Sequence, residues 1–421
     1  MTDQAPEVGR RSLVAYGAGK VIPGILLFLA VPLWTRTFGA EQYGFYSIAW
    51  SVSLFSGSLF TGWIRQALLR HTGNDAATLQ SLPRWTIPTS SLLSSLPVAA
   101  LVVLQLQTVG DTASFAISAI LFAVINTAYT VSQAAAQRAG HSGTYTLAEV
   151  LRVGGAVLAS LLIYALAGFE GGTSILIGFC LSTLGAMGIL AWRRPASHAH
   201  LTRTTQALTG NSALATFWRY GWPMAIWLAA SSLLLYQDRV IIGSILGASA
   251  AGEYAAVSDV IVRGFAMVSF PLTMVSHPLI MGAWNRGEIR SAMAINRTFK
   301  RYLVWISLVI IFAGCVFGRV LLEIILGIRI SEPLLVPLLL VGAALWQIGL
   351  MTHKELEVEN RTRLMATLIV SISVLSAIAN VLTTDRAGVI GPAVVFASGA
   401  AAYTLTTHCL GARLRRRSLL V

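Results

Sequence analysis

The sequence predicts an all-α polytopic membrane protein in which twelve transmembrane helices form two six-helix lobes around a central cavity. Composition is the first reason, because 55% of the 421 residues are hydrophobic and only 11% are charged, against about 25% charged in a soluble domain. Twelve apolar segments are the second reason, and a motif repeated at half the chain length is the third. Since no long polar segment remains, the chain is not a soluble enzyme held by a membrane anchor.

The apolar segments each reach or approach the ~20 residues that cross the hydrocarbon core as an α-helix. They are built on eight stretches free of Asp, Glu, Lys and Arg, and on four shorter stretches that become spans once one terminal or embedded charge is allowed. The connections are short, so successive helices should be antiparallel neighbours. The predicted spans are 13–36, 43–69, 85–107, 112–136, 144–168, 173–192, 213–237, 251–282, 302–326, 333–353, 364–384 and 388–411.

The repeated motif indicates two related halves. FGAxxxGxY at 38–46 returns as LGAxxxGxY at 246–254, 208 residues later. Many secondary transporters are built from two such halves. The connection 193–212 has linker character and separates a first lobe, 1–192, from a second lobe, 213–421.

Each motif copy has the residues of a tight helical hairpin. Gly39 and Gly247 are suited to the left-handed conformation that ends a helix. Gly44 and Gly252 permit close packing where the next helix starts. The tyrosine that closes each copy is expected to bury its ring and keep its hydroxyl in water. We therefore expect a structural turn here, not contact with a substrate.

The positive charges predict the orientation. Twenty-two of the 30 Lys and Arg residues fall on the side of the membrane that holds the N-terminus, and four on the other. The positive-inside rule then places both termini in the cytoplasm, in agreement with an even number of spans. Arg outnumbers Lys 27 to 3, which fits a GC-rich bacterial gene. We therefore expect a multi-pass protein of the bacterial cytoplasmic (inner) membrane.

The remaining polar features exclude several classes of function. The net charge of +13 is dispersed over short inner loops, where it meets anionic lipid head groups, so no nucleic-acid partner is expected. His198 and His200 lack a third ligand for a metal site. No Walker A, G-x-S-x-G or HExxH sequence is present, so we expect neither a catalytic residue nor a cofactor.

Charged residues within the spans carry the functional information, because a charge at the bilayer centre costs roughly 2.5–3.5 kcal/mol on insertion scales and should face protein or water. Four cations are candidates for binding a substrate, and two carboxylates are candidates for coupling or ion pairing. The cations are Lys20, Arg65, Arg152 and Arg263, and the carboxylates are Glu149 and Asp259.

For these charges two interpretations stay open. Glu149 and Arg152 are spaced i,i+3, and Asp259 and Arg263 i,i+4, so that each pair can neutralise itself along one helix face. Cargo contact and a structural ion pair are thus both compatible with the pattern, and Arg65 could also snorkel into head groups. Snorkelling is the expectation for the charges at outer helix ends, which are Arg36, Arg239, Arg319, Glu323 and Arg329.

Three segments resemble one protein family. RTFGAEQYGFYSIA at 36–49 is similar to the first outer loop of the bacterial polysaccharide flippases, R-x-L-G-x-x-x-Y-G-x-Y/F-x-x-A, with Phe38 in place of Leu. QRAGH at 137–141 and the segment 238–254 resemble an inner loop and a helix connection of the same family. The resemblance implies the multidrug/oligosaccharidyl-lipid/polysaccharide (MOP) superfamily.

The resemblance further implies a non-enzymatic flippase that moves a polyprenyl-diphosphate-linked oligosaccharide, or a related polysaccharide precursor, from the inner to the outer leaflet by alternating access. Its partners would be this glycan, membrane lipids and other polysaccharide-assembly proteins, and we expect a monomer. Lys and Arg in a water-filled cavity offer charge and donors to a diphosphate. Neither the glycan nor a coupling ion follows from the sequence.

Two other functions are the alternatives. A cation-coupled small-molecule or drug antiporter of the same superfamily would favour carboxylates in the first lobe, yet spans 1–4 contain no internal Asp or Glu. A membrane polymerase or ligase of the same glycan pathway would need a large outer loop, and the outer loops here are short.

Overall fold

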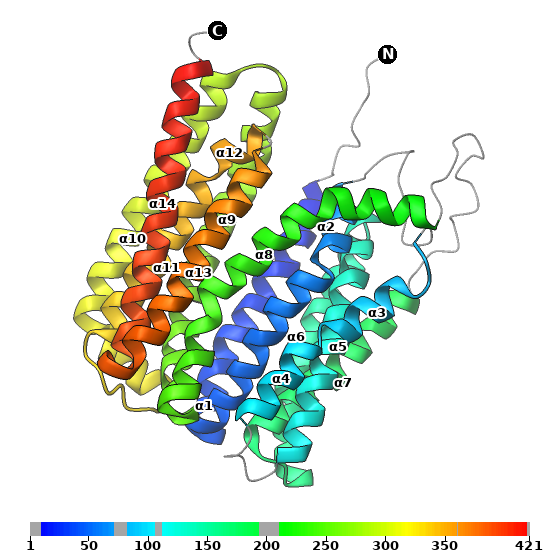
Figure 1. The fold of residues 1–421 in the computed structure, drawn as a ribbon, viewed down its shortest axis with the longest axis vertical. Helices are drawn as coiled ribbons and strands as arrows, with labels where there is room; N and C mark the ends of the chain where they lie inside the picture. The colour runs from blue at the N-terminus through cyan, green and yellow to red at the C-terminus, as the bar shows by residue number, and fades with distance from the viewer. Residues whose placement is uncertain (1–9, 71–81, 106–111, 193–209, 360, 419–421) are drawn as a thin grey trace. The chain divides into compact units, whose positions relative to one another are not determined.

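A computed structural model of the chain describes residues 10–70, 82–105, 112–192, 210–359 and 361–418, with the side chains of 10–16, 20, 70, 103–105, 112 and 414–418 outside this description. Every regular element within these ranges is a helix (Figure 1). The helices are α1 (Arg10–Phe60), α2 (Gly62–Arg70), α3 (Thr86–Leu93), α4 (Leu96–Gln105), α5 (Thr112–Arg138), α6 (Ser142–Ala167), α7 (Gly171–Trp192), α8 (Asn211–Leu246), α9 (Ala248–Asn285), α10 (Ile289–Leu326), α11 (Leu335–Thr352), α12 (Lys354–Val358), α13 (Thr362–Ala387) and α14 (Ile390–Ser418).

The helices agree with the predicted class of fold. Within the described ranges, ten of them are long and apolar enough to cross a membrane. One of these, α1, contains the first predicted span and most of the second, with a break in its helical backbone at Gly39. The third predicted span is divided into α3 and α4. Each of the twelve predicted spans therefore has a helical counterpart, and the all-α membrane fold class is confirmed.

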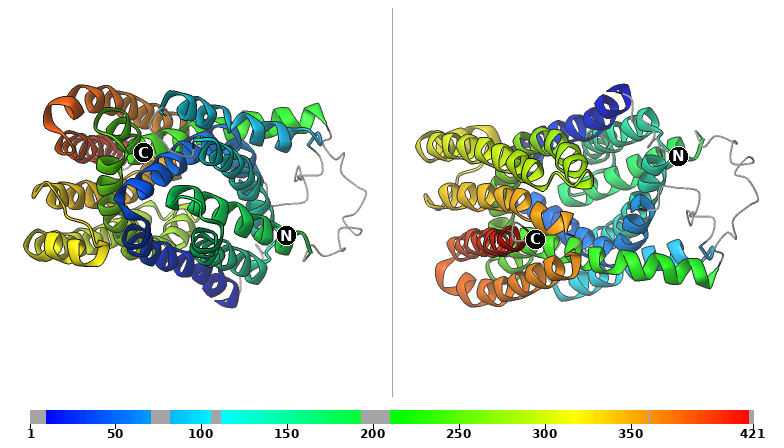
Figure 2. Two further views of the ribbon diagram at one scale, coloured as in Figure 1. Left: turned by 90° about the horizontal axis from the view of Figure 1, so that it is seen from below. Right: turned by 90° about the horizontal axis from the view of Figure 1, so that it is seen from above.

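Contacts between residues group the chain into two compact units. Unit 1 contains residues 1–27 and 56–225, and unit 2 contains 28–55 and 226–421. In unit 1, α7 packs on α5 and α6, while α2 and α3 pack on α5. In unit 2, α11 packs on α9, α10 and α14, and α14 also packs on α13 (Figure 2). The lobe boundaries at 192 and 213 stay a prediction.

The surface of unit 2 is apolar along α10. Trp305 is 68% exposed, Val309 67% and Phe312 74%, and all three lie on this one helix. A continuous row of exposed aromatic and aliphatic side chains is unfavourable in water. It is the expected surface for a helix that faces lipid, as it does in a multi-pass membrane protein.

The two copies of the repeated motif pack against each other within unit 2. Gly39 and Gly247 have φ of 86° and 91° with ψ of 164° and 167°. The expected positive φ is confirmed, but the ψ values differ from those of the left-handed helix and lie in a region that is essentially restricted to glycine. The next helix of each copy therefore leaves this turn in a direction that other residues do not readily allow.

The second glycine of each copy forms the contact itself. A Cβ on Gly44 would overlap the carbonyl oxygen of Ala248 and lie 3.0 Å from the amide nitrogen of Gly252. A Cβ on Gly252 would overlap the carbonyl oxygen of Ala40 and lie 2.9 Å from the amide nitrogen of Gly44. The contact is reciprocal, so the expectation of close packing at these glycines is confirmed, and the repeat itself supplies both partners.

Candidate functional site

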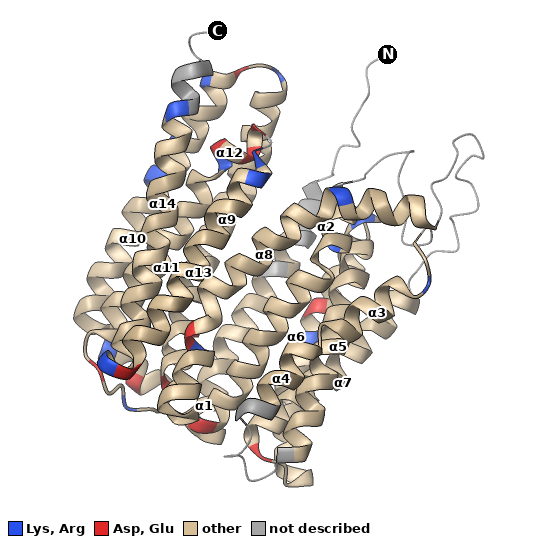
Figure 3. Ribbon diagram, in the orientation of Figure 1, with Lys and Arg blue, Asp and Glu red and all other residues tan. Residues whose placement is uncertain are grey.

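Glu149 is the centre of a polar cluster in unit 1. It lies on α6 and is buried, and it accepts hydrogen bonds from the Tyr129 hydroxyl (2.8 Å) and the Gln133 amide of α5. Arg152, one turn further along α6, forms an ion pair with its second oxygen at 3.2 Å. The Arg152 guanidinium also lies 5.3 Å from the centre of the Tyr129 ring. Figure 3 shows an acidic and a basic residue close together on α6.

Arg65 adds a second cation to this Glu149 cluster. It lies on α2, is half-buried, and interacts electrostatically with Glu149 and with Tyr145. Among the charged groups described here, two guanidinium groups face one carboxylate. The Glu149 cluster therefore brings two guanidinium groups to one buried carboxylate, in a low-dielectric environment where electrostatic interactions act strongly.

Asp259 is the centre of a second cluster, in unit 2. Arg239 of α8 donates to one carboxylate oxygen at 2.6 Å. The other oxygen accepts hydrogen bonds from Arg263 of α9 at 3.2 Å and from the Tyr43 hydroxyl of α1 at 2.5 Å. The Asp259 side chain is 4% exposed, and those of Arg239 and Arg263 are 1% and 19% exposed. Two cations thus share a single carboxylate on α9.

Asp238 completes the charge balance of this Asp259 cluster. Its carboxylate accepts hydrogen bonds from the Tyr254 hydroxyl at 2.5 Å and from the backbone amide of Arg239 at 2.9 Å. Two carboxylates then match two guanidinium groups. The hydroxyl of Tyr254, which closes the second motif copy, donates to a buried carboxylate, so the expectation that it would lie in water is wrong.

The snorkelling prediction for Arg239 is also wrong. Its side chain is 1% exposed and packs over the Tyr236 ring, with the guanidinium carbon 4.8 Å from the ring centre. The reason is Asp259, which is separated from Arg239 by 20 positions in sequence but lies within hydrogen-bonding distance. Position at a helix end predicts snorkelling only where no buried counter-ion is available.

The predicted site residues thus fall into two clusters. Glu149, Arg152 and Arg65 meet in unit 1, whereas Asp259 and Arg263 meet in unit 2. Lys20 lies in α1, but its side chain is outside the described residues. The residues that the sequence analysis missed are Tyr43, Tyr129, Gln133, Asp238 and Arg239.

Part of this set had a detectable signal. Tyr129 and Gln133 are spaced i,i+4 and so lie on one face of α5. Two hydrogen-bonding side chains one turn apart in a membrane span indicate a polar partner. Tyr43 had no comparable signal, because its partner is 216 positions away.

No metal site emerges from the geometry of the described ranges: they contain no group of three or more His, Cys, Asp or Glu side chains placed to hold an ion. The carboxylates of the two clusters are instead engaged by guanidinium, phenol and amide groups. In this arrangement the carboxylates pair with arginine side chains of the protein itself.

Solved structures with the same fold are transporters. The chain superimposes on an inward-facing multidrug resistance MATE family transporter of the MOP superfamily with a TM-score of 0.65, at 13% identity, over 96% of this chain and 98% of the other. An outward-facing transporter of that family gives 0.58 at 16% identity, over 97% and 96%. A MOP superfamily transporter from Pyrococcus furiosus, described as having a binding pocket of reverse polarity, gives 0.59 at 14% identity, over 98% and 96%.

These similarities establish the fold. The chain has the MATE-like fold of MOP superfamily transporters and is a multi-pass membrane protein. No protein-family model and no curated protein sequence matches it.

Proposed function

We propose that the protein is a flippase of the MOP type that moves a polyprenyl-diphosphate-linked oligosaccharide, or a related glycan precursor, from the inner to the outer leaflet of a bacterial cytoplasmic membrane. The observation that carries the proposal is the presence of two guanidinium groups, those of Arg65 and Arg152, at the single carboxylate of the Glu149 cluster. A diphosphate head that enters a low-dielectric region needs compensating cations. Guanidinium groups supply charge and a planar set of donors that matches phosphate oxygens.

A cation-coupled drug antiporter is the second candidate, because two of the transporters with the same fold are multidrug transporters. A cationic drug would need an available carboxylate. Glu149 already accepts hydrogen bonds from Tyr129 and Gln133 and is paired with Arg152. The Pyrococcus furiosus transporter, whose pocket of reverse polarity is described as suggesting a different function, is a precedent for functional differences within this fold.

The proposal gives different roles to the four predicted cations. Arg65 and Arg152 contact the diphosphate, and Lys20 adds a further positive charge from α1. Arg263 is balanced within its own cluster, since Asp238 and Asp259 match Arg239 and Arg263 in charge. We therefore expect Arg263 to contribute less to cargo binding than the cations of unit 1.

Replacing Arg65 by Gln should lower the rate of glycan-lipid transfer roughly tenfold or more, since a hydrogen bond to a charged group contributes about 1.5–3 kcal/mol. Transfer is measured with the purified protein in vesicles, as the exposure of a polyprenyl-diphosphate-linked sugar to a glycosidase outside. Arg290→Gln is the matched control, because it removes an exposed cation of α10 far from the Glu149 cluster in sequence.

For Lys20, activity retained in Lys20→Arg and lost in Lys20→Gln would show that charge is required.

The same vesicles distinguish the two candidate functions. Transport of a fluorescent cationic drug without transfer of the glycan lipid would reject the flippase and support the antiporter. Normal glycan-lipid transfer by Arg65→Gln, Arg152→Gln and Lys20→Gln, each at normal protein level, would remove the proposed cargo site.

Orientation is tested by cysteine labelling. In a variant with Cys180, Cys315 and Cys409 replaced by Ser, His198→Cys should react with an impermeant maleimide only after the cells are opened, because 193–212 is predicted to be cytoplasmic. Glu332→Cys, between α10 and α11, should react in intact cells. Labelling of position 198 from outside would contradict the predicted topology.

A further inference from the structure

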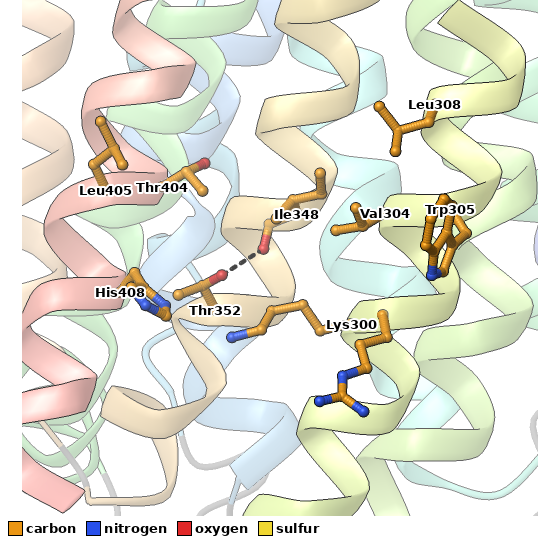
Figure 4. A pocket seen from close by; sticks show the side chains of 10 residues that line it. Lys300, Val304, Trp305, Leu308, Ile348, Thr352, Thr404, Leu405 and His408 are labelled. Atoms are coloured by element: carbon orange, nitrogen blue, oxygen red, sulfur yellow. Dashed lines mark hydrogen bonds between the residues drawn. The ribbon is translucent and has the colours of Figure 1, made fainter.

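A pocket of about 360 Å³ lies within unit 2, between α10, α11 and α14. Helix α10 contributes Lys300, Arg301, Val304, Trp305 and Leu308 to its wall. Figure 4 shows the Lys300 side chain extending from α10 toward α11, with Trp305 and Leu308 further along α10 on the same side of the pocket. The pocket therefore has a basic end and an apolar end.

Its position matches the depth of lipid head groups. Towards the C-terminus, α10 continues as the row of exposed apolar side chains that includes Val309 and Phe312. In the other direction it carries Arg297, Lys300 and Arg301 within five positions. The change from apolar to basic marks the boundary between hydrocarbon and head groups, and Trp305 lies at this boundary, where tryptophan is enriched. The charge distribution predicts that this end of α10 is cytoplasmic.

The polar groups of the pocket favour an anion. The Thr352 hydroxyl donates to the carbonyl oxygen of Ile348 at 2.8 Å, and the Thr404 hydroxyl to that of Leu345 at 2.7 Å. Both hydroxyl protons are therefore already used in hydrogen bonds to carbonyl oxygens of α11. The cations of α10, the Trp305 indole and the His408 imidazole also line the pocket, and among the described residues no carboxylate does. Such a basic pocket between membrane helices on the cytoplasmic side is typical of lipid head-group sites.

We propose that this pocket binds an anionic glycerophospholipid of the cytoplasmic leaflet, with its phosphodiester at Lys300 and Arg301 and an acyl chain along Val304, Leu308 and Leu405. The observations favour this occupant because the apolar wall continues directly onto the exposed face of α10, so that an acyl chain reaches the pocket from the bilayer. A guanidinium and an ammonium group at its basic end match the phosphate oxygens.

The test measures binding of fluorescent phosphatidylglycerol to the purified full-length protein in a neutral detergent. The double variant Lys300→Ala with Arg301→Ala should bind it roughly tenfold or more weakly than the unmodified protein, since each cation near an anionic lipid contributes to attraction. The unmodified protein should bind phosphatidylcholine at least tenfold more weakly than phosphatidylglycerol.

A matched control removes the same charge from the same helix. Arg290 and Arg297 are exposed on α10 and do not line the pocket, so Arg290→Ala with Arg297→Ala should leave phosphatidylglycerol binding within twofold. Equal losses in the two double variants would overturn the site, as would equal binding of phosphatidylcholine by the unmodified protein. Preferential binding of a polyprenyl diphosphate would overturn the phospholipid as occupant. These outcomes do not depend on glycan-lipid transfer, so failure of the lipid site and of the flippase are distinguishable.

Discussion

Replacing Asp259 by Ala should destabilise the folded protein by about 3–5 kcal/mol, because removing one partner of a buried ion pair leaves an uncompensated charge. In this protein the substitution would break two ion pairs at once, because Arg239 and Arg263 both pair with the Asp259 carboxylate. The Tyr43 hydroxyl loses its acceptor as well. We expect a low yield of detergent-solubilised protein and a lower melting temperature in a thermal unfolding assay.

Double variants test the cause of this instability. Adding Arg263→Ala to Asp259→Ala should restore little stability, because Arg239 remains buried without its partner. Adding Arg239→Met should restore more, since the remaining Arg263 is 19% exposed and so is partly solvated. Normal stability of Asp259→Ala, or a larger rescue through Arg263, would contradict this account. If the double variant Asp259→Ala with Arg239→Met regains stability but not transport, Asp259 has a role in transport beyond its ion pairs.

Replacing Gly44 or Gly252 by Ala should also be strongly destabilising. Overpacking commonly costs about 1–3 kcal/mol and occasionally more. We expect the upper end or beyond, because the added Cβ would overlap a backbone carbonyl oxygen, that of Ala248 or Ala40, and not the end of a flexible side chain. The melting temperature of the purified variants measures the effect.

Gly185 provides the control for these substitutions. It lies within α7, and a Cβ there would meet no atom within 4 Å. Gly185→Ala should therefore leave stability unchanged or raise it by up to about 1 kcal/mol, through the higher helix propensity of Ala. If Gly44→Ala and Gly252→Ala behaved like Gly185→Ala, the two motif copies would not depend on this close contact.

The double replacement separates the two sides of the contact. Because the amide of each glycine lies about 3 Å from a Cβ added to the other, Gly44→Ala and Gly252→Ala act on the same helix pair. Their effects should not add, since the separation forced by the first substitution already makes room for the second. Strict additivity would show that the two positions are independent.

The helical membrane fold could be predicted from the sequence because the signal for it is local. Each span is a continuous apolar segment of about 20 residues, and hydrocarbon leaves the backbone no alternative to an internally hydrogen-bonded helix. Charge pairs such as Glu149–Arg152 could also be predicted from the sequence, since residues three or four positions apart share one face of a helix. The glycines of the repeat were predicted to permit close packing, and the structure confirms it.

Only the tertiary structure decided which partners these residues have. Arg239 and Tyr43 reach Asp259 across 20 and 216 positions of sequence, and no helical spacing relates such residues. The same holds for the contact of Gly44 with Gly252. It holds too for the interaction of Glu149 with Arg65, which comes from another helix. Hydrophobicity and helix periodicity act along the chain, whereas the pairing of a buried charge depends on which helices pack together.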